Sequence, residues 1–209
     1  ALTAFASVTS NYNGAKISCP GANDAVITAI ANGGNGGFTY VLVESPLNIT
    51  GNATGIYTGV GPGTYTVSVT DAQSCNVVTV PVNITDPTPL NASGVVSSVI
   101  SCNGGSDGEI RISSTGGTGA YTFTMTSPAG PSNATGIFSG LPQGTYDFQV
   151  RDLNNCTDVV QVILGQPIAV TASALTQTPY NGSQISCNGA SDGIINVTAS
   201  GGTGALTYV

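Results

Sequence analysis

Three copies of one signature divide the 209-residue chain, so it must fold as a series of similar modules. Each copy opens with Ile-Ser-Cys and has an Asp five residues after the Cys, at residues 17–24, 100–107 and 185–192. A Gly-Gly-x-Gly run follows each signature, beginning at Gly33, Gly116 and Gly201. The copies predict two domains, residues 1–87 and 88–167, and the first half of a third, residues 168–209.

A longer period is superposed on the shorter one. Residues 1–41 align without a gap on residues 169–209, and 21 of the 41 pairs are identical. The tripeptide at residues 12–14 recurs at residues 180–182, but the middle copy lacks it, so the larger repeating unit is a pair of unlike domains. The half copy has two explanations: a window of a longer array, or a domain that a strand from another chain completes.

Apolar and polar residues alternate within each copy, as they do in half-buried β-strands. The pattern is clear at residues 65–70, 146–151 and 109–113, and closing strands are marked by Val78, Val80 and Val82 and by Val160, Val162 and Leu164. The positions expected to face the core are Ile27, Ala29, Ile110, Ile112, Ile195 and Val197. No helical period is sustained, and six or seven short strands in about 80 residues favour all-β, immunoglobulin-like sandwiches in tandem.

A tyrosine follows a Gly at the start of one strand in each full copy, at Tyr65 and Tyr146. This placement is typical of a tyrosine corner, whose hydroxyl donates to loop backbone, although an ordinary core aromatic is an equal alternative.

Five cysteines divide into two pairs and one remainder. Pairing within each copy predicts the disulfides Cys19–Cys75 and Cys102–Cys156, with Cys187 bonded to a cysteine beyond residue 209. Such bonds indicate an oxidising, extracytoplasmic location. The cysteines lie outside the alternating segments, so the bonds are expected at one end of each sandwich.

The acidic residues recur beside the cysteines, which allows two interpretations. Asp24, Asp71, Asp107 and Asp152 are weak candidates for calcium ligands, and the alternative is that they cap tight turns. Other metal sites are not expected, because the chain has no His and no Cys-x-x-Cys. Paired carboxylates also occur in glycosidases, but acids that recur in every copy are typical of structural residues, so we expect no cofactor and no enzyme activity.

Eight Asn-x-Ser/Thr triplets are candidate glycosylation sites, although a sequence rich in Asn and Thr produces many by chance. They begin at Asn48, Asn52, Asn83, Asn91, Asn133, Asn155, Asn181 and Asn196.

Charge limits the partners. The chain has three Lys or Arg against ten Asp or Glu, a net charge of −7. Nucleic acids and anionic membrane surfaces need clustered basic residues, so neither is expected as a partner. No apolar run is long enough to span a membrane, so no membrane insertion is expected.

The signature resembles the SprB repeat. Residues 100–167 carry the resemblance best, through Ile-Ser-Cys-Asn-Gly-x-Ser-Asp-Gly, Gly-Gly-Thr-Gly, Leu-Pro-x-Gly-Thr-Tyr and a closing Gln-Pro, whereas the first copy departs at Pro20, Asn23 and its closing Asp-Pro. The resemblance implies very large cell-surface proteins of gliding Bacteroidota, exported by type IX secretion, that act as mobile adhesins or filaments.

We therefore expect a structural stalk of an extracellular adhesin or surface filament. Its partners would be neighbouring repeats, copies of itself, or surface glycans and other cells. One alternative is a filament subunit polymerised by strand exchange, in which residues 1–16 pair with another chain. The other is a carbohydrate-binding module of a secreted protein, which the absence of Trp disfavours.

Overall fold

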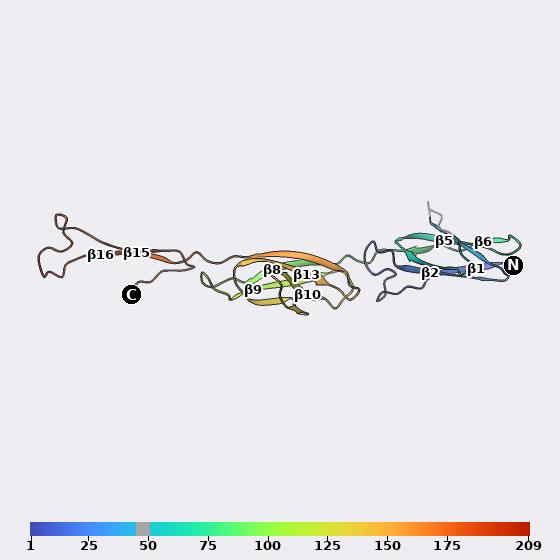
Figure 1. The fold of residues 1–209 in the computed structure, drawn as a ribbon, viewed down its shortest axis with the longest axis horizontal. Coiled ribbons are helices and arrows are strands. Elements are labelled where there is room, and N and C mark those ends of the chain that lie inside the picture. Colours follow the sequence, from blue (N-terminus) through green and yellow to red (C-terminus); the bar gives the residue numbers. More distant parts are fainter. Residues whose placement is uncertain (45–50) are drawn as a thin grey trace. The chain divides into compact units, whose positions relative to one another are not determined.

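The structure is a computed structural model that describes residues 1–44 and 51–209. In the described residues every regular element is a β-strand, and Figure 1 shows arrows joined by loops. The predicted all-β fold is therefore confirmed. None of the described residues forms a helix long and apolar enough to cross a membrane.

The strands of residues 1–87 form two antiparallel sheets, as in an immunoglobulin-like sandwich. One sheet has the order β1-β2-β4, and the other has β3-β5-β6 with β7 also on β5. The seven described strands are β1 (Thr3–Val8), β2 (Ala25–Asn32), β3 (Thr39–Glu44), β4 (Ile56–Val60), β5 (Gly63–Thr70), β6 (Asn76–Val78) and β7 (Val82–Ile84).

The strands of residues 88–167 repeat this arrangement with sheets β12-β9-β8 and β11-β10-β13-β14. The seven strands here are β8 (Asn91–Ser98), β9 (Gly108–Thr115), β10 (Thr122–Ser127), β11 (Ser132–Asn133), β12 (Ile137–Leu141), β13 (Gly144–Arg151) and β14 (Thr157–Leu164). The predicted six to seven strands per copy are therefore confirmed for the described residues.

Alternation placed the core correctly in the two full copies. In β5 the buried residues are Tyr65, Val67 and Val69, and in β13 they are the matching Tyr146, Phe148 and Val150. Ile27, Ala29, Ile110 and Ile112 are also buried, as predicted. The outward positions between them carry polar side chains, so each strand has one apolar face toward the core.

Both tyrosines form the predicted corner. The Tyr65 hydroxyl donates to the carbonyl of Gly61 at 3.0 Å, and the Tyr146 hydroxyl donates to the carbonyl of Pro142 at 2.7 Å. Each hydroxyl thus ties the start of its strand to the preceding turn.

The closing strand of the first copy differs from the prediction. Val78 and Val80 are exposed, and Thr79 between them is buried, where its Oγ1 accepts a hydrogen bond from the Val67 amide at 3.0 Å. Pro81 has no amide hydrogen to donate, and the strand is divided into β6 and β7 at this point. The matching segment of the second copy has no proline there, and β14 runs unbroken with Val162 and Leu164 buried.

The prediction of two core positions in the third copy is wrong for this chain. Residues 168–209 form one described hairpin, β15 (Thr171–Thr176) paired with β16 (Ile195–Ser200). Ile195 and Val197 are 65% and 48% exposed, because no second sheet packs on this hairpin in the described part of the chain.

Internal contacts divide the chain into two compact units. The first consists of residues 1–92, 114–123 and 149–159, and the second of residues 93–113, 124–148 and 160–209. Three segments of the second copy, residues 88–92, 114–123 and 149–159, therefore belong to the same unit as the whole first copy. The predicted domain boundaries after residues 87 and 167 remain predictions.

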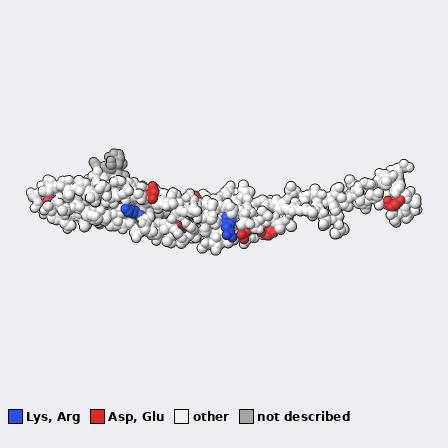
Figure 2. Space-filling view, turned by 180° about the vertical axis from the view of Figure 1, so that it is seen from behind, with Lys and Arg blue, Asp and Glu red and all other residues white. Residues whose placement is uncertain are grey.

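Charged side chains are sparse on the face shown in Figure 2, where a few small blue and red patches lie on a largely white surface. This agrees with a composition of only 6% charged residues. Solvation of the surface therefore depends on Ser, Thr and Asn side chains and on backbone groups.

Candidate functional site

The cysteine pairing connects the two full copies. Cys19 is bonded to Cys156, 137 residues away, with 5.6 Å between their Cα atoms. Cys75, Cys102 and Cys187 are unpaired and exposed in the structure. The predicted bonds Cys19–Cys75 and Cys102–Cys156 are therefore wrong. The predicted bond of Cys187 stays a prediction.

Each first cysteine lies in a short turn, which we call the cysteine turn, residues 17–24 and its equivalents 100–107 and 185–192. The Cys19 carbonyl accepts from the Ala22 amide at 3.0 Å, and the Asp24 carboxylate accepts from the Ser18 amide at 3.1 Å. The other two turns have the same two bonds within 0.1 Å, so the sequence signature specifies one rigid shape. These two hydrogen bonds fix the backbone of the turn and therefore the position of the cysteine Cα.

The first two cysteine turns are also tied to the segment that leaves their sandwich. The Gly21 amide donates to the Asp86 carboxylate at 2.7 Å, and the matching Gly104 amide donates to Gln166 Oε1 at 2.7 Å. Asp86 and Gln166 belong to the closing Asp-Pro and Gln-Pro pairs of the sequence. The cysteine turn therefore lies at the C-terminal end of its sandwich.

Each second cysteine lies in a cysteine loop, residues 71–75 and 152–156, built on one Asp. In the second copy Asp152 Oδ1 accepts from the amides of Asn154 and Cys156, both at 2.9 Å, and Oδ2 accepts from the Thr118 amide at 2.8 Å. Asp152 is buried, so these amides replace the water that its carboxylate loses.

The loop of the first copy has the same construction. Asp71 accepts from the amides of Gln73 and Cys75 at 2.9 Å and of Asn35 at 3.0 Å. Chiefly through the Cys75 amide, these bonds hold the pKa of Asp71 below its ordinary value, although burial acts in the opposite direction. Both loops thus present their cysteine in the same way.

The two cysteines of one copy lie at opposite ends of a strand, which explains why they do not pair. The cysteine turn precedes β2, whereas the cysteine loop contacts the segment after β2, where the Ala72 amide donates to the Gly36 carbonyl at 2.9 Å. An eight-residue strand spans about 26 Å, and a disulfide needs Cα atoms within about 7 Å. The expectation that both cysteines share one end of the sandwich is wrong for this reason.

A glycine pair allows the segment after the strand to contact the cysteine loop. Gly116 and Gly117 have φ angles of +71° and +59°. A Cβ on Gly117 would lie 2.7 Å from the Asp152 carboxylate and 3.0 Å from Leu90, and one on Gly116 would meet the Pro89 carbonyl. The Gly-Gly pair of the signature is therefore needed both for backbone conformation and for space.

Asn154 fastens the cysteine loop of the second copy to the first. Its Nδ2 lies 3.1 Å from the Tyr12 carbonyl, 3.3 Å from the Ser18 carbonyl and 2.9 Å from Thr118 Oγ1, and its Oδ1 accepts from Asn13 Nδ2 at 2.6 Å. These contacts surround the disulfide with polar bonds from the segment before Cys19. The contact between the first two copies, which we call the Cys19 junction, is thus formed by hydrogen bonds as well as by a covalent bond.

The tripeptide at residues 12–14 carries part of this junction, which sequence reasoning missed. Tyr12 and Ala15 exchange backbone bonds at 2.8 and 3.0 Å, Asn13 has a φ angle of +52°, and the Tyr12 hydroxyl donates to the Asp24 carbonyl at 3.0 Å. The presence of the tripeptide only in alternate copies was the available signal. In the first copy it lies beside the cysteine turn and contacts the Asn154 side chain.

The disulfide contributes to stability through the length of the loop that it closes. Cross-linking residues 137 apart lowers the entropy of the unfolded chain, which corresponds to about 5 kcal/mol in the chain-entropy model. This is comparable with the whole folding free energy of a small domain.

The four calcium candidates act as turn caps in the structure. Asp24 and Asp107 each accept the amide of the Ser that precedes the cysteine, and Asp71 and Asp152 hold the cysteine loops. Within residues 1–44 and 51–209, no three His, Cys, Asp or Glu side chains gather as a metal site would require. The geometry therefore agrees with the turn-cap alternative.

Two of the glycosylation triplets build a turn. Asn52 Oδ1 accepts from the Gly55 amide at 2.7 Å and Nδ2 donates to the Ile56 carbonyl at 3.1 Å, and Asn133 makes the same bonds to Gly136 and Ile137. The Asn-Ala-Thr-Gly sequence is thus explained by its fold. Asn83, Asn91, Asn155, Asn181 and Asn196 are exposed, and Asn48 lies outside the described residues.

Comparisons with solved structures find similar folds at low identity. The three N-terminal domains of the highly immunogenic outer capsid protein of bacteriophage RB49 match with 12% identity and a TM-score of 0.48, covering 97% of this chain and 71% of that one. The N-terminal eight Ig domains of Down syndrome cell adhesion molecule match with 11% identity and a TM-score of 0.41, covering 94% and 28%. A tetra-tandem repeat from the extending region of a large adhesion protein matches with 14% identity and a TM-score of 0.28, covering 96% and 63%.

No curated protein matches the chain. The sequence model of the SprB repeat matches two segments, residues 95–130 and 180–209. Each segment contains a cysteine turn and the whole strand after it, β9 or β16. The predicted resemblance to the SprB repeat is therefore confirmed over residues 95–130 and 180–209.

Proposed function

We propose that this chain is a stalk segment of an extracellular repeat adhesin or surface filament. The bond between Cys19 and Cys156 carries the proposal, because it joins a turn of one copy to a loop of the next. Under tension, such a bond bypasses the polypeptide between its ends and keeps it from being drawn out. A device of this kind is useful to a module that transmits force.

The other features agree with this role. The disulfide and the SprB repeat match both support an extracellular, adhesion-type protein. When repeats share one fold and contact only their neighbours, a protein can become longer without requiring a new kind of contact. The scarcity of charge disfavours nucleic acid as a partner, so the partners proposed are neighbouring repeats or copies of the same protein. Gliding motility, mobile adhesion and the absence of enzyme activity are parts of this proposal.

Electron microscopy of the native surface protein, labelled with an antibody against this chain, tests the proposal. Label along a thin beaded fibre that projects from the cell is the expected result. A compact labelled particle, or label confined to the cell interior, would refute the stalk function.

A filament polymerised by strand exchange is a second candidate, favoured by the open face of the β15–β16 hairpin. Its predicted donor was residues 1–16, but β1 pairs with β2 of its own chain from Thr3↔Asn32 to Val8↔Ile27. Sedimentation velocity over a range of concentrations distinguishes the two: exchange produces polymers of the 20.7 kDa chain, whereas a stalk segment remains a monomer.

A further inference from the structure

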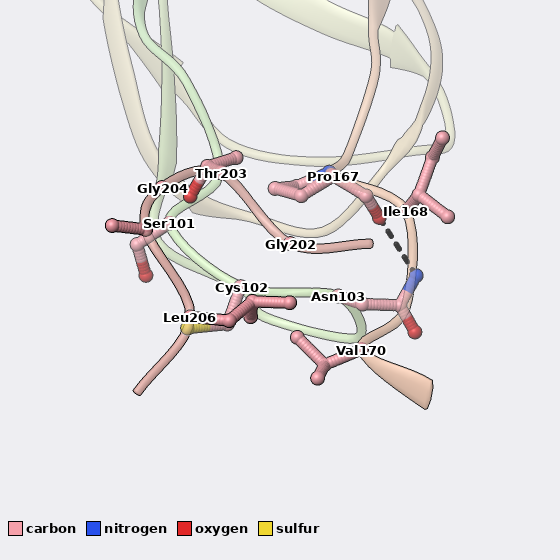
Figure 3. A pocket seen from close by; sticks show the side chains of 11 residues that line it. Ser101, Cys102, Asn103, Pro167, Ile168, Val170, Gly202, Thr203, Gly204 and Leu206 are labelled. Atoms are coloured by element: carbon pink, nitrogen blue, oxygen red, sulfur yellow. Dashed lines mark hydrogen bonds between the residues drawn. The ribbon is translucent and has the colours of Figure 1, made fainter. Parts of the chain in front are cut away.

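A cavity lies beside Cys102, at the second of the three cysteine turns. It measures about 250 Å³ and is lined by the cysteine turn at residues 101–103, by the segment that leaves the second copy, and by residues 202–206 of the third. Figure 3 shows the Cys102 side chain among these residues and the bond from Asn103 Nδ2 to the Pro167 carbonyl, which is 2.9 Å long. Cys102 itself is exposed and unpaired.

The glycine pairs show which element belongs in this cavity. A Cβ on Gly34 would meet Leu2 and the Asp71 carboxylate, and one on Gly117 would meet Leu90 and the Asp152 carboxylate. A Cβ on Gly202, the matching residue of the third copy, would meet only Val170 within 4 Å of the described chain. In both full copies, therefore, an Asp of a cysteine loop packs where the cavity lies in the third.

The open face of the hairpin identifies the same occupant independently. Ile195 and Val197 match Ile27 and Ala29, which are buried in the first copy under the sheet that contains β3 and β5. That sheet and the cysteine loop both lie within residues 39–84 of the first copy. One polypeptide, the second half of a sandwich like that of residues 1–87, would therefore cover the apolar face of the β15–β16 hairpin and fill the cavity at Cys102.

The free Cys75 shows that such a half carries a suitable thiol. Its loop has the same Asp-amide bonds as the loop that presents Cys156 to Cys19, and Ser74 and Asn155 share a positive φ of 65° and 68°. Cys102 lies in a cysteine turn that has the same two hydrogen bonds as the turn of Cys19. Both halves of a second junction are therefore present and unpaired in this chain.

We propose that the cavity at Cys102 receives the Asp-x-x-x-Cys loop of a polypeptide equivalent to residues 42–87, which packs on the β15–β16 hairpin and forms a disulfide with Cys102. The two thiols lose two protons and two electrons, and one sulfur–sulfur bond forms. Oxidised glutathione is a sufficient acceptor, because its disulfide is reduced to two glutathione thiols. The inference extends the proposed stalk function and names the partner that each cysteine turn binds.

The test extends the full chain at Val209 by a second copy of residues 42–87, since Val209 aligns with Val41. The chain is oxidised with glutathione disulfide, digested without reduction, and mapped by mass spectrometry. A peptide linking Cys102 to the appended cysteine is expected, with Cys187 still open to alkylation. Amides of β16 should also exchange hydrogen at least tenfold more slowly than in the 209-residue chain.

Three controls accompany the test, and three outcomes would overturn the inference. Cys102→Ser in the extended chain should leave the appended cysteine free, Cys187→Ser should change nothing, and the 209-residue chain should keep Cys102 alkylatable. A link from the appended cysteine to Cys187, or a Cys102 that stays free, would overturn the inference. So would unchanged exchange in β16, because the added half would then not pack on this face. None of these results bears on whether the native protein forms a fibre.

Discussion

The disulfide between Cys19 and Cys156 limits how far the chain can be stretched. If the chain is held at its two ends and pulled until it unfolds, the 137 residues between these cysteines cannot extend while the bond is intact. A fully extended residue adds at most about 3.3–3.6 Å, so the bond withholds about 450–490 Å of length. Cys156→Ser should release this length.

Single-molecule force spectroscopy measures this quantity directly. The oxidised chain is pulled from Ala1 and Val209, first as it is and then as the Cys156→Ser variant. We expect the total unfolded length of the variant to exceed that of the original by the amount above. Cys75→Ser is the matched control, because this thiol is unpaired in the structure and its loss should leave the length unchanged.

Disulfides within each copy would give different unfolded lengths, so the measurement can refute the bond between the copies. Disulfides Cys19–Cys75 and Cys102–Cys156 would each withhold about 180–200 Å, and Cys75→Ser would release one of these portions. Equal lengths for the original chain and Cys156→Ser would show that no bond bypasses this segment. Either result would also remove the observation that supports the stalk.

Three further predictions concern the junction and the core. Asn154→Ala removes the contacts to Tyr12, Asn13 and Thr118, and should lower the free energy of unfolding of the oxidised chain by about 1–3 kcal/mol in urea titrations. The folded pKa of Asp71 is depressed, so its stabilisation is complete above the ordinary pKa of about 4 and is lost as pH falls toward the folded value. Calorimetry should therefore show a constant melting temperature from about pH 7 to pH 5 and a decline below about pH 4. Finally, the buried Tyr57 hydroxyl faces the Leu42 backbone but forms no hydrogen bond of good geometry with the described residues, so Tyr57→Phe should raise stability by about 1 kcal/mol, and a loss of stability would show that the Leu42 contact is a real hydrogen bond.

The Tyr57 prediction has an internal precedent in the second copy. Tyr57 lies opposite Ile27 in the sheet, and Phe138 lies opposite the matching Ile110. The second copy thus fills the same core position without a hydroxyl, and Phe138 packs 4.7 Å from the ring of Phe148.

Strand positions followed from the sequence because burial in a sheet has a period of two residues. That period located the inward residues of β5, β9 and β13, and the tyrosines at the strand starts located two corners. It failed at Pro81, where a missing amide divides the strand, and in the third copy, where alternation alone does not say whether a second sheet covers Ile195. A residue pattern indicates which face is apolar, and only packing decides whether that face is covered.

The cysteine pairing could not be obtained in the same way. Every full copy has one cysteine of each kind, so pairing within a copy and pairing between neighbours leave the same sequence pattern. The difference is set by the direction of β2, which carries the chain about 26 Å from the Cys19 turn to the segment that contacts the Asp71 loop. Asn154 was missed because a single amide in a turn has no periodicity to reveal it.

The span between Cys19 and Cys156 also changes what proteolysis can do. A protease that cuts the backbone once at any bond from residue 20 to residue 155 leaves both products attached through sulfur. Exposed loops on a cell surface are the usual targets of such nicking. A surface protein with this arrangement would survive a cut that severs an ordinary string of domains, and only a second lesion, or a reductant, would release the outer part.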